Sequence, residues 1–507
     1  MTLALSLALA LNKEITNLKN DMTKNSESRT QRMTNFRWVM CALLFVATTV
    51  NYLDRQVLSL TWKDFISVDF GWSDSQYGTI TGFFSIFYAV ACLFSGKFID
   101  KLGTRKGYLW AIFIWSVGAC MHAACGWGAL KWAGAESMEA AKNSADIMLL
   151  VTTASVYMFI FCRAVLALGE SGNFPAAIKV TAEYFPKKDR AFATSIFNAG
   201  ASVGALAAPA CIPPLAAATS WEMAFIIIGA LGFVWMFFWF GLYRKPEESR
   251  FVNQAELEYI HQDDAVELAA AKAAEPVKEE KSIPFFKCFS FRQTWAFICG
   301  KFFTDGVWWF FLFWAPAYFS DQYGYRSDSA MAIKLIFVLY LIVTVVSIGG
   351  GYLPKFFVEK KGMEPYSGRM KAMLIFAFFP LLALFAQPLG KYSAWFPAII
   401  IGLAGAGHQA WSANLYSTIG DMFPKSTIGT ITGVGTTMGG LASFMINKGA
   451  GMLFTKSDAM GSAFSFLGFE GKEAGYMIVF CICAVAYLIG WTVMKLLVPK
   501  YKPIVVD

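Results

Sequence analysis

The sequence is poor in charged residues and in histidine. Only 15% of its 507 residues are Asp, Glu, Lys or Arg, and it contains three histidines. A soluble globular domain has about 25% charged residues. A soluble protein with so few charges and 56% hydrophobic residues would expose large apolar patches. The composition therefore argues against a soluble protein and predicts one that is embedded in lipid.

Motifs for metal binding, nucleotide hydrolysis and covalent catalysis are also absent. The ten cysteines are scattered, mostly inside apolar runs, and none belongs to a CxxC pair. There is no Walker phosphate-binding loop, which argues against an ATP-driven pump. With three histidines and no Ser/His/Asp arrangement, we expect no enzyme, no cofactor and no metal site.

The sequence is rich in long apolar runs. A membrane-spanning helix needs about 20 apolar residues. Such runs predict helices at 37–58, 76–97, 107–126, 147–172, 192–213, 222–243, 294–319, 330–351, 371–389, 394–419, 428–453 and 475–498. We therefore predict an all-α membrane protein with twelve transmembrane helices.

One long hydrophilic segment, residues 244–292, divides the predicted helices into two groups of six. Its run from Ala265 to Lys281 is rich in Ala, Glu and Lys, which is typical of an amphipathic helix or a flexible linker. We predict a disordered cytoplasmic tail at 1–35, an N-terminal six-helix half at 36–243, a cytoplasmic linker at 244–292 and a C-terminal six-helix half at 293–499.

The positions of basic residues predict the orientation in the membrane. Lysines and arginines gather after the second, fourth, eighth and last predicted spans, and the intervening loops carry far fewer. Because short cytoplasmic loops are enriched in these residues, we expect both termini on the cytoplasmic side of the cell (inner) membrane. The net charge of +8 then comes from the lysines and arginines of the predicted cytoplasmic loops. The expected partner is the lipid bilayer, and nucleic acid is not one.

The two halves repeat a short motif. Glu183-Tyr-Phe-Pro-Lys187 after the fourth predicted span parallels Asp421-Met-Phe-Pro-Lys425 after the tenth, and a Gly/Ala/Thr-rich helix follows each. Two similar six-helix halves in the same orientation are typical of secondary transporters, which bind substrate near the midplane between the halves. A partner-independent channel would not need this arrangement.

Several motifs are similar to those of a known superfamily. The loop Gly96-Lys-Phe-Ile-Asp100-Lys-Leu-Gly103-Thr-Arg105-Lys106 resembles the loop signature of the major facilitator superfamily, and Arg163 through Gly169 with Pro175 resembles its fourth-helix pattern. The counterpart in the second half, Gly351 through Gly362, is degraded. The resemblance covers roughly residues 35–500 and departs at the N-terminal tail and at a polar insert near 127–146.

Three further strings resemble the anion:cation symporter family within that superfamily. They are Asn51-Tyr-Leu-Asp54-Arg55, Gly169-Glu170 with Pro175, and His408-Gln-Ala-Trp-Ser-Ala-Asn414, of which the last is closest to bacterial hexuronate transporters. The resemblance implies the major facilitator fold and a proton-coupled symporter that imports a hexuronate such as glucuronate or galacturonate. Two alternatives stay open. One is a symporter for another organic acid such as an aldonate, and the other is a transporter-like ligand sensor. We expect a monomer.

Ionisable residues inside predicted spans are candidates for function, since each costs about 2.5–3.5 kcal/mol to insert. A fixed guanidinium can grip a carboxylate through two parallel hydrogen bonds, so Arg55 is expected to bind the substrate, with Asp54 as a proton acceptor. Arg163 and Glu170 share a helix face about 10 Å apart, and Glu170 is expected to be a proton site linked to Arg163. An interfacial Asp54–Arg55 pair and a structural Arg163–Glu170 pair are the alternatives.

A second group of candidates would line the substrate cavity. Asp305 near the middle of the seventh span belongs with the proton-coupling residues, and Trp308 beside it would pack against a sugar ring. A polar cluster in the tenth span and two residues elsewhere would bind sugar hydroxyls: His408, Gln409, Ser412, Asn414, Tyr88 and Asn198. Helix packing is the alternative for each of them.

The loop after the second span is expected to act in gating. By resemblance, Asp100, Gly103 and Arg105 would pack between helices on the cytoplasmic side and hold one conformation closed. The glycines in Gly200-Ala-Ser-Val-Gly204 would allow two helices to approach closely.

Overall fold

The computed structural model describes residues 33–262 and 283–504. Residues 1–32 of the predicted tail, and the run from Ala265 to Lys281, lie outside the described residues. The expectations for these two segments therefore stay predictions.

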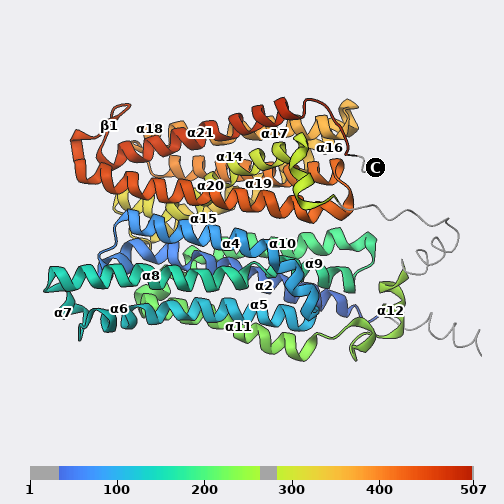
Figure 1. The fold of residues 1–507 in the computed structure, drawn as a ribbon, viewed down its shortest axis with the longest axis horizontal. Coiled ribbons are helices and arrows are strands. Elements are labelled where there is room, and N and C mark those ends of the chain that lie inside the picture. Colours follow the sequence, from blue (N-terminus) through green and yellow to red (C-terminus); the bar gives the residue numbers. More distant parts are fainter. Residues whose placement is uncertain (1–32, 263–282, 505–507) are drawn as a thin grey trace, which may run out of the picture.

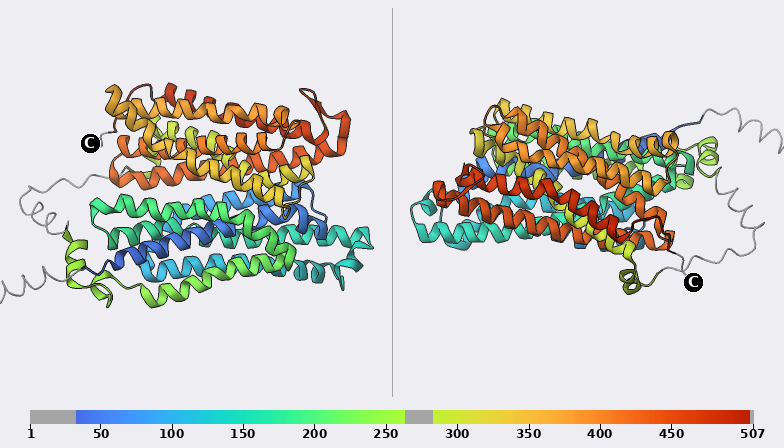
Figure 2. Two further views of the ribbon diagram at one scale, coloured as in Figure 1. Left: turned by 180° about the vertical axis from the view of Figure 1, so that it is seen from behind. Right: turned by 90° about the horizontal axis from the view of Figure 1, so that it is seen from above.

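Two bundles of long helices lie side by side (Figure 1). The first bundle, blue to green, contains α2 (Phe36–Thr61), α4 (Asp74–Leu102), α5 (Thr104–Met121), α8 (Ala145–Glu170), α10 (Lys187–Ala218) and α11 (Trp221–Leu242). The second, yellow to red, contains α14 (Arg292–Tyr323), α15 (Ala330–Ser347), α17 (Pro365–Leu381), α19 (Trp395–Met422), α20 (Lys425–Met460) and α21 (Gly471–Leu497). The views from behind and from above show the same arrangement (Figure 2).

Shorter elements extend or join these helices. A π-helical turn (Trp62–Ile66) and α3 (Ser67–Phe70) continue α2, and a 3₁₀ turn (His122–Ala124) and α6 (Cys125–Ala133) continue α5. Others are α7 (Met138–Lys142), α9 (Asn173–Tyr184), α12 (Gln254–Ile260), α16 (Gly349–Lys361), α18 (Ala386–Gly390), 3₁₀ turns at Pro246–Glu248, Phe285–Ser290, Leu382–Phe385 and Gly461–Ala463, and the antiparallel pair β1 (Ser465–Phe466) and β2 (Phe469–Glu470).

The α7 and α12 elements lie at opposite ends of the bundles (Figure 1), so we call these the α7 end and the α12 end. By the distribution of basic residues, the α12 end is the predicted cytoplasmic end.

Ten helices of the described residues are long and apolar enough to cross a membrane. They cover ten of the twelve predicted spans. The remaining two spans, 394–419 and 428–453, fall on α19 and α20, which are long helices with many polar and glycine residues. The all-α membrane fold is thus confirmed, and the count of twelve is consistent with it. Helices suit this environment because they satisfy their own backbone hydrogen bonds.

Glycines bring α4 and α20 into backbone contact across the two bundles. A Cβ atom at Gly78 would collide with the carbonyl oxygen of Asn447, and one at Gly451 would collide with that of Asp74. Between these helices the hydroxyls of Ser85 and Ser443 also lie 2.7 Å apart. Larger residues at the glycine positions would push the bundles apart.

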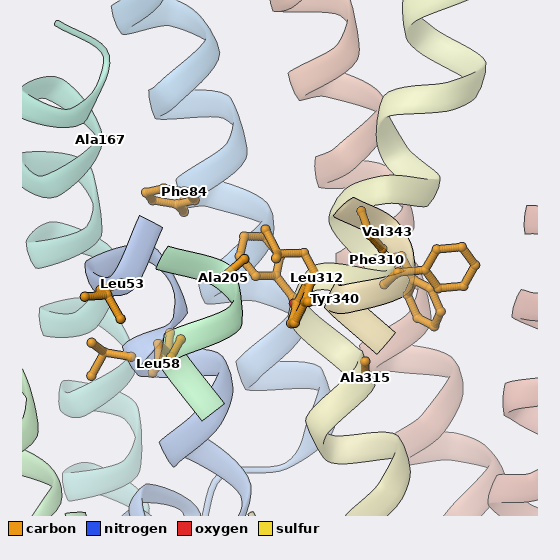
Figure 3. Close-up of a cluster of buried hydrophobic side chains, with 14 of the residues drawn as sticks. Leu53, Leu58, Phe84, Ala167, Ala205, Phe310, Leu312, Ala315, Tyr340 and Val343 are labelled. Carbon is orange, nitrogen blue, oxygen red and sulfur yellow. The ribbon is translucent and has the colours of Figure 1, made fainter. Parts of the chain in front are cut away.

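Close packing also joins helices within and between the bundles elsewhere. Gly200 and Gly204 let the backbone of α10 approach α2, as their spacing predicts. Figure 3 shows the buried apolar side chains in the middle of the molecule, where Leu53 and Phe84 of the first bundle belong to the same core as Leu312 and Tyr340 of the second. This shared core sets the spacing of the helices that carry the site.

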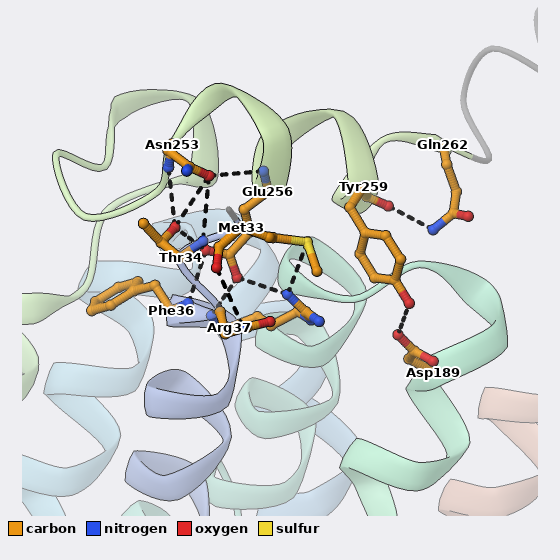
Figure 4. Close-up of polar contacts among 10 residues, drawn as sticks. Met33, Thr34, Phe36, Arg37, Asp189, Asn253, Glu256, Tyr259 and Gln262 are labelled. Carbon is orange, nitrogen blue, oxygen red and sulfur yellow. Dashed lines mark hydrogen bonds and ion pairs between the residues drawn. The ribbon is translucent and has the colours of Figure 1, made fainter. Parts of the chain in front are cut away.

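A buried glutamate ties α12 to the start of α2 (Figure 4). The Glu256 carboxylate accepts hydrogen bonds from the backbone N–H groups of Phe36 (2.8 Å) and Arg37 (3.0 Å), and from the hydroxyl of Thr34 (2.6 Å). It also pairs with the Arg37 guanidinium at 3.0 Å. An anion at a helix N-terminus satisfies free N–H groups and complements the helix dipole. Glu256 therefore fixes where the first long helix begins.

We expect Glu256→Ala to destabilise the protein by about 3–5 kcal/mol, because it leaves the buried Arg37 guanidinium without its carboxylate. Thermal unfolding of the purified protein in detergent measures this. Glu258→Ala on the same helix, where Glu258 is exposed and accepts a hydrogen bond from Gln254 (3.2 Å), is the matched control. Equal melting temperatures for both variants would contradict the assignment.

Candidate functional site

A cavity of about 710 Å³ lies between the two bundles. Residues of α2, α4 and α9 line it from one side, and residues of α14, α19 and α20 line it from the other. Its lining runs from Arg55 in the middle of the bundles to Ile178 and Gly429 toward the α12 end. This volume and the mixture of aromatic and polar walls are typical of small-molecule sites.

The Arg55 guanidinium on α2 is the charged group of the first bundle that lines the cavity. Its Nε and Nη2 atoms donate to one oxygen of Glu170, at 3.0 and 2.8 Å. Three aromatic rings surround the guanidinium carbon, Tyr88 at 4.6 Å, Tyr52 at 5.1 Å and Trp309 at 5.2 Å. Cation–π contacts of this kind hold a planar guanidinium in one orientation.

Glu170 on α8 pairs with Arg55, whereas the sequence linked it to Arg163. The side chains of Glu170 and Arg163 are both buried, and the second Glu170 oxygen, Oε1, has no hydrogen-bond partner in the described part of the chain. Arg163 instead lies over the ring of Phe84, at 5.2 Å. Glu170 therefore pairs with Arg55 of α2 and not with Arg163 of its own helix, and the alternative of a structural Arg163–Glu170 pair is not present.

Asp54 lies behind Arg55, in the interior of the first bundle, and is not among the residues that line the cavity. It is 1% exposed, and neither carboxylate oxygen has a hydrogen-bond partner within the described ranges. Its polar neighbours are Trp115, Glu170 and Arg163. This burial rules out the alternative of an Asp54–Arg55 pair that reaches interfacial water.

The second bundle contributes a cation that the sequence analysis missed. The Lys301 ammonium on α14 pairs with Asp305 one turn later at 2.6 Å, and it donates to the hydroxyl of Tyr416 at 3.1 Å. Lys301 and Asp305 both line the cavity. The criterion that selected Asp305, an ionisable group inside a predicted span, applies equally to Lys301 and could have found it.

Aromatic and polar residues of α14 and α19 line the same side of the cavity. Trp308 stacks on His408, with ring centroids 5.4 Å apart and planes 3° from parallel. The Nδ1 atom of His408 lies 2.7 Å from the hydroxyl of Tyr487. Gln409 and Ser412, one residue and one turn further along α19, also line the cavity. The structure thus brings Tyr88, Trp308, His408, Gln409 and Ser412 together.

Two predicted binding residues lie elsewhere. Asn414 is buried and donates to the carbonyls of Gly350 (2.9 Å) and Ala410 (2.8 Å), so it joins α19 to α16. Asn414 follows Ser412 by two residues, which corresponds to a rotation of about 200° around the helix axis. Its side chain is therefore on the opposite face of α19. Asn198 on α10 is exposed and is not part of the cavity lining.

The predicted gating loop makes its described contacts inside the first bundle. Asp100 pairs with Lys179 at 2.7 Å, and Arg105 donates to the carbonyl of Phe240 at 3.1 Å. Gly103 between them has φ of 76°, a conformation that favours glycine. The three residues shape the turn between α4 and α5, and their role in gating stays a prediction.

Four charged residues close the α7 end between the bundles. Lys63 pairs with Asp74 (3.3 Å) and Asp321 (2.8 Å), and Lys472 pairs with Asp74 (2.7 Å) and Asp321 (2.8 Å). Lys63 and Asp74 belong to the first bundle, Asp321 and Lys472 to the second. We call this alternating ring the ionic quartet. Its members lie at the ends of four separate helical segments, so no single motif in the sequence points to it.

Two helical bundles that surround a central cavity, with one end closed by contacts between the bundles, define the architecture of a secondary transporter. A family model described as Major Facilitator Superfamily matches residues 44–446. The chain belongs to the major facilitator superfamily, and it is a transporter and not an enzyme.

Individual relatives agree with this assignment. The chain is similar to a hexuronate transporter of Escherichia coli (strain K12), with 26% identity over 92% of this chain and 95% of the relative. It is also similar to a protein of the same strain named "Probable galactarate/D-glucarate transporter", with 24% identity over 88% of this chain and 94% of the relative. A crystal structure of a D-xylose-proton symporter shares the fold, with a TM-score of 0.63 and 15% identity over 90% of this chain and 98% of that one. The resemblance to the anion:cation symporters is thereby confirmed.

We expect Asp321→Asn to loosen the α7 end, because it weakens two ion pairs that join the bundles. The equilibrium constant for closure of this end should fall about tenfold, equivalent to about 1.4 kcal/mol. Hydrogen-exchange mass spectrometry should then show faster exchange at residues 60–80 and 318–328.

The control is Lys142→Gln, which removes an exposed pair at the same end, Lys142 with Asp69 at 3.8 Å. Exposed pairs of this kind contribute little. Unchanged exchange in Asp321→Asn would show that the ionic quartet does not hold this end closed.

Proposed function

We propose that this chain is a proton-coupled symporter that imports a sugar acid, with a hexuronate such as glucuronate or galacturonate as substrate. It would work as a monomer by alternating access in the cell (inner) membrane, with both termini cytoplasmic. The observation that carries the proposal is the Arg55–Glu170 pair at the cavity wall, in a chain that is similar to a hexuronate transporter over nearly its whole length.

Substrate binding would exchange one carboxylate for another on Arg55. A guanidinium has five N–H donors in a fixed plane and prefers two parallel bonds to a carboxylate. Glu170 uses the Nε and Nη2 donors, so a substrate carboxylate that takes this edge releases Glu170. A buried carboxylate without a cation is costly unless it is protonated, so the released Glu170 would take up a proton.

The interior of the first bundle offers a second proton site. Asp54 is buried, without hydrogen-bond partners among the described residues, and lies within electrostatic range of Glu170 and Arg163. A carboxylate in this setting depends on a proton or on Arg163 for compensation of its charge. We propose that Asp54 and Glu170 carry the coupled proton, and that Arg163 adjusts the balance between them.

The second bundle would recognise the hydroxyl-bearing part of the substrate. The stacked rings of Trp308 and His408 give a flat wall for the sugar ring. Gln409 and Ser412 supply donors and acceptors beside it, and Tyr88 does so from the first bundle. Sites that combine apolar walls with a few placed polar groups are typical for small ligands.

The cavity runs to the α12 end, while the ionic quartet closes the α7 end. This arrangement suits a state that is accessible from the predicted cytoplasmic side. The opposite state would require the ionic quartet to open and the bundles to close at the α12 end. Asp100, Gly103 and Arg105 lie there, which fits their expected part in gating.

We expect Glu170→Gln to abolish proton-driven accumulation of glucuronate in proteoliposomes, with a loss of about a hundredfold or more, because glutamine cannot carry the proton. Exchange of labelled for unlabelled glucuronate, which needs no net proton movement, should be better preserved. Asp146→Asn, an exposed carboxylate at the start of the same helix, is the matched control.

Gradient-driven accumulation that survives in Glu170→Gln would contradict the coupling role of Glu170. Binding without accumulation under any imposed ion gradient would favour the ligand sensor instead. The absence of glucuronate binding would reject the hexuronate assignment and leave the family unchanged.

We expect Arg55→Lys to weaken glucuronate binding by about ten- to a hundredfold although the charge is kept, because an ammonium cannot form the planar bidentate contact. Isothermal titration calorimetry on the purified protein measures the affinity. Arg326→Lys, at an exposed Arg326–Asp328 pair (3.2 Å), is the control. Wild-type affinity in Arg55→Lys would place the carboxylate elsewhere.

A further inference from the structure

Two cysteines of the first bundle lie against each other toward the α7 end, away from the cavity. Cys125 at the start of α6 and Cys162 on α8 are 37 positions apart in the chain, and their Sγ atoms lie 3.6 Å apart. Both are free cysteines, and each is 3% exposed. The proposed transport mechanism uses neither thiol, so the pair calls for an explanation of its own.

The geometry suits a disulfide between these two residues. The helices α6 and α8 pack on each other (Figure 1), and a Cβ atom at Gly128 would collide with the Sδ atom of Met158, so the two helices are close at this level. An S–S bond is about 2.0 Å long, so each sulfur has to move by about 0.8 Å from its present position. Rotation of the two side chains supplies a movement of this size.

A groove beside the two thiols gives a reagent access to them. Its volume is about 660 Å³, and both cysteines line it together with exposed side chains such as Trp132 and Tyr157. Most of the other side chains that line the groove are apolar. An apolar oxidant can therefore reach the sulfurs although they are shielded from water.

A disulfide at this position would close a loop around the polar insert. The segment between the two cysteines contains α7 and the residues near 127–146 that depart from the resemblance to the superfamily. The ion pair of this segment with α3, Lys142 with Asp69 at 3.8 Å, is exposed and contributes little. A covalent bond between α6 and α8 would restrict the unfolded chain far more. Because both cysteines belong to the first bundle, the bond would leave the two bundles free to move against each other.

We propose that Cys125 and Cys162 are an oxidation site, at which a disulfide fastens α6 to α8. The α7 end is opposite the predicted cytoplasmic end, and disulfides form and persist outside the reducing cytoplasm. One cysteine, as its thiolate, attacks an oxidant that itself contains a disulfide and releases one thiol from it. The second cysteine then attacks the mixed disulfide and releases the other thiol. Two protons and two electrons thus pass from the cysteines to the oxidant, which leaves as two thiols.

The test compares oxidised with reduced protein, both purified at full length in detergent. The aromatic disulfide dithiodipyridine is added until Cys211, an exposed cysteine on α10, has reacted, and the reduced sample is kept in a phosphine reductant. The remaining thiols are then alkylated in denaturant, and peptide mass spectrometry locates any cross-link. Melting temperature and amide hydrogen exchange are measured on both forms. Cys125→Ser and Cys162→Ser each remove the pair, and Cys211→Ser is the matched control.

We expect the peptides that contain Cys125 and Cys162 to be joined, with the loss of two hydrogen atoms, in most of the oxidised protein. The oxidised wild-type protein should melt a few degrees above the reduced protein, because the cross-link restricts the unfolded chain. Amide exchange at residues 127–146 should slow by about threefold or more, because local opening of this segment becomes less favourable. Both differences should persist in Cys211→Ser and vanish in Cys125→Ser and Cys162→Ser.

Two outcomes overturn the inference. One is protein in which Cys125 and Cys162 are not joined once Cys211 has reacted, which would show that the pair does not close. The other is a disulfide between them that leaves the melting temperature and the amide exchange at the values of the reduced protein, which would show that it does not fasten α6 to α8. Neither outcome bears on the proposed function, because the test involves no substrate.

Discussion

The Arg55–Glu170 ion pair is the interaction on which the rest of the site depends. A guanidinium and a carboxylate are removed from water at the wall of a cavity, where each would be costly alone. The rings of Tyr52, Tyr88 and Trp309 fix the guanidinium from three directions and offer no competing acceptor as strong as a carboxylate. We propose that an anion entering this cavity replaces Glu170 on Arg55, which would link substrate binding to the charge state of Glu170.

Helix packing places the two partners of this pair against each other. A Cβ atom at Gly169 would collide with the backbone of Trp115, so the glycine lets α8 lie close to α5 and aims the next residue, Glu170, toward α2. The contact between α4 and α20 then holds the two bundles together through Gly78 and Gly451 near the closed α7 end. A transporter needs one end to separate while the other stays packed, and this glycine contact beside the ionic quartet is suited to a reversible closure.

Much of this structure could be predicted from the sequence, for identifiable reasons. Apolar runs determined the helices because lipid requires about 20 apolar residues for each span, and the cost of charge in lipid pointed to Arg55, Asp54, Arg163, Glu170 and Asp305. The partner of Glu170 was not predictable, since Arg163 lies on the same helix and Arg55 is brought in only by tertiary packing. Asn414 lies on the opposite face of α19 from Ser412, and it is therefore not part of the cavity lining. Lys301 could have been predicted, because it is also an ionisable residue inside a predicted span.

The central claim is that substrate displaces Glu170 from Arg55 and that Glu170 then takes up a proton. Calorimetry of glucuronate binding in buffers with different ionisation enthalpies measures the protons taken up by the detergent-solubilised protein on binding. We expect net proton uptake by the wild-type protein, and binding without that uptake by Glu170→Gln. Binding of glucuronate with no proton uptake by the wild-type protein, or with the same uptake by Glu170→Gln, would contradict it.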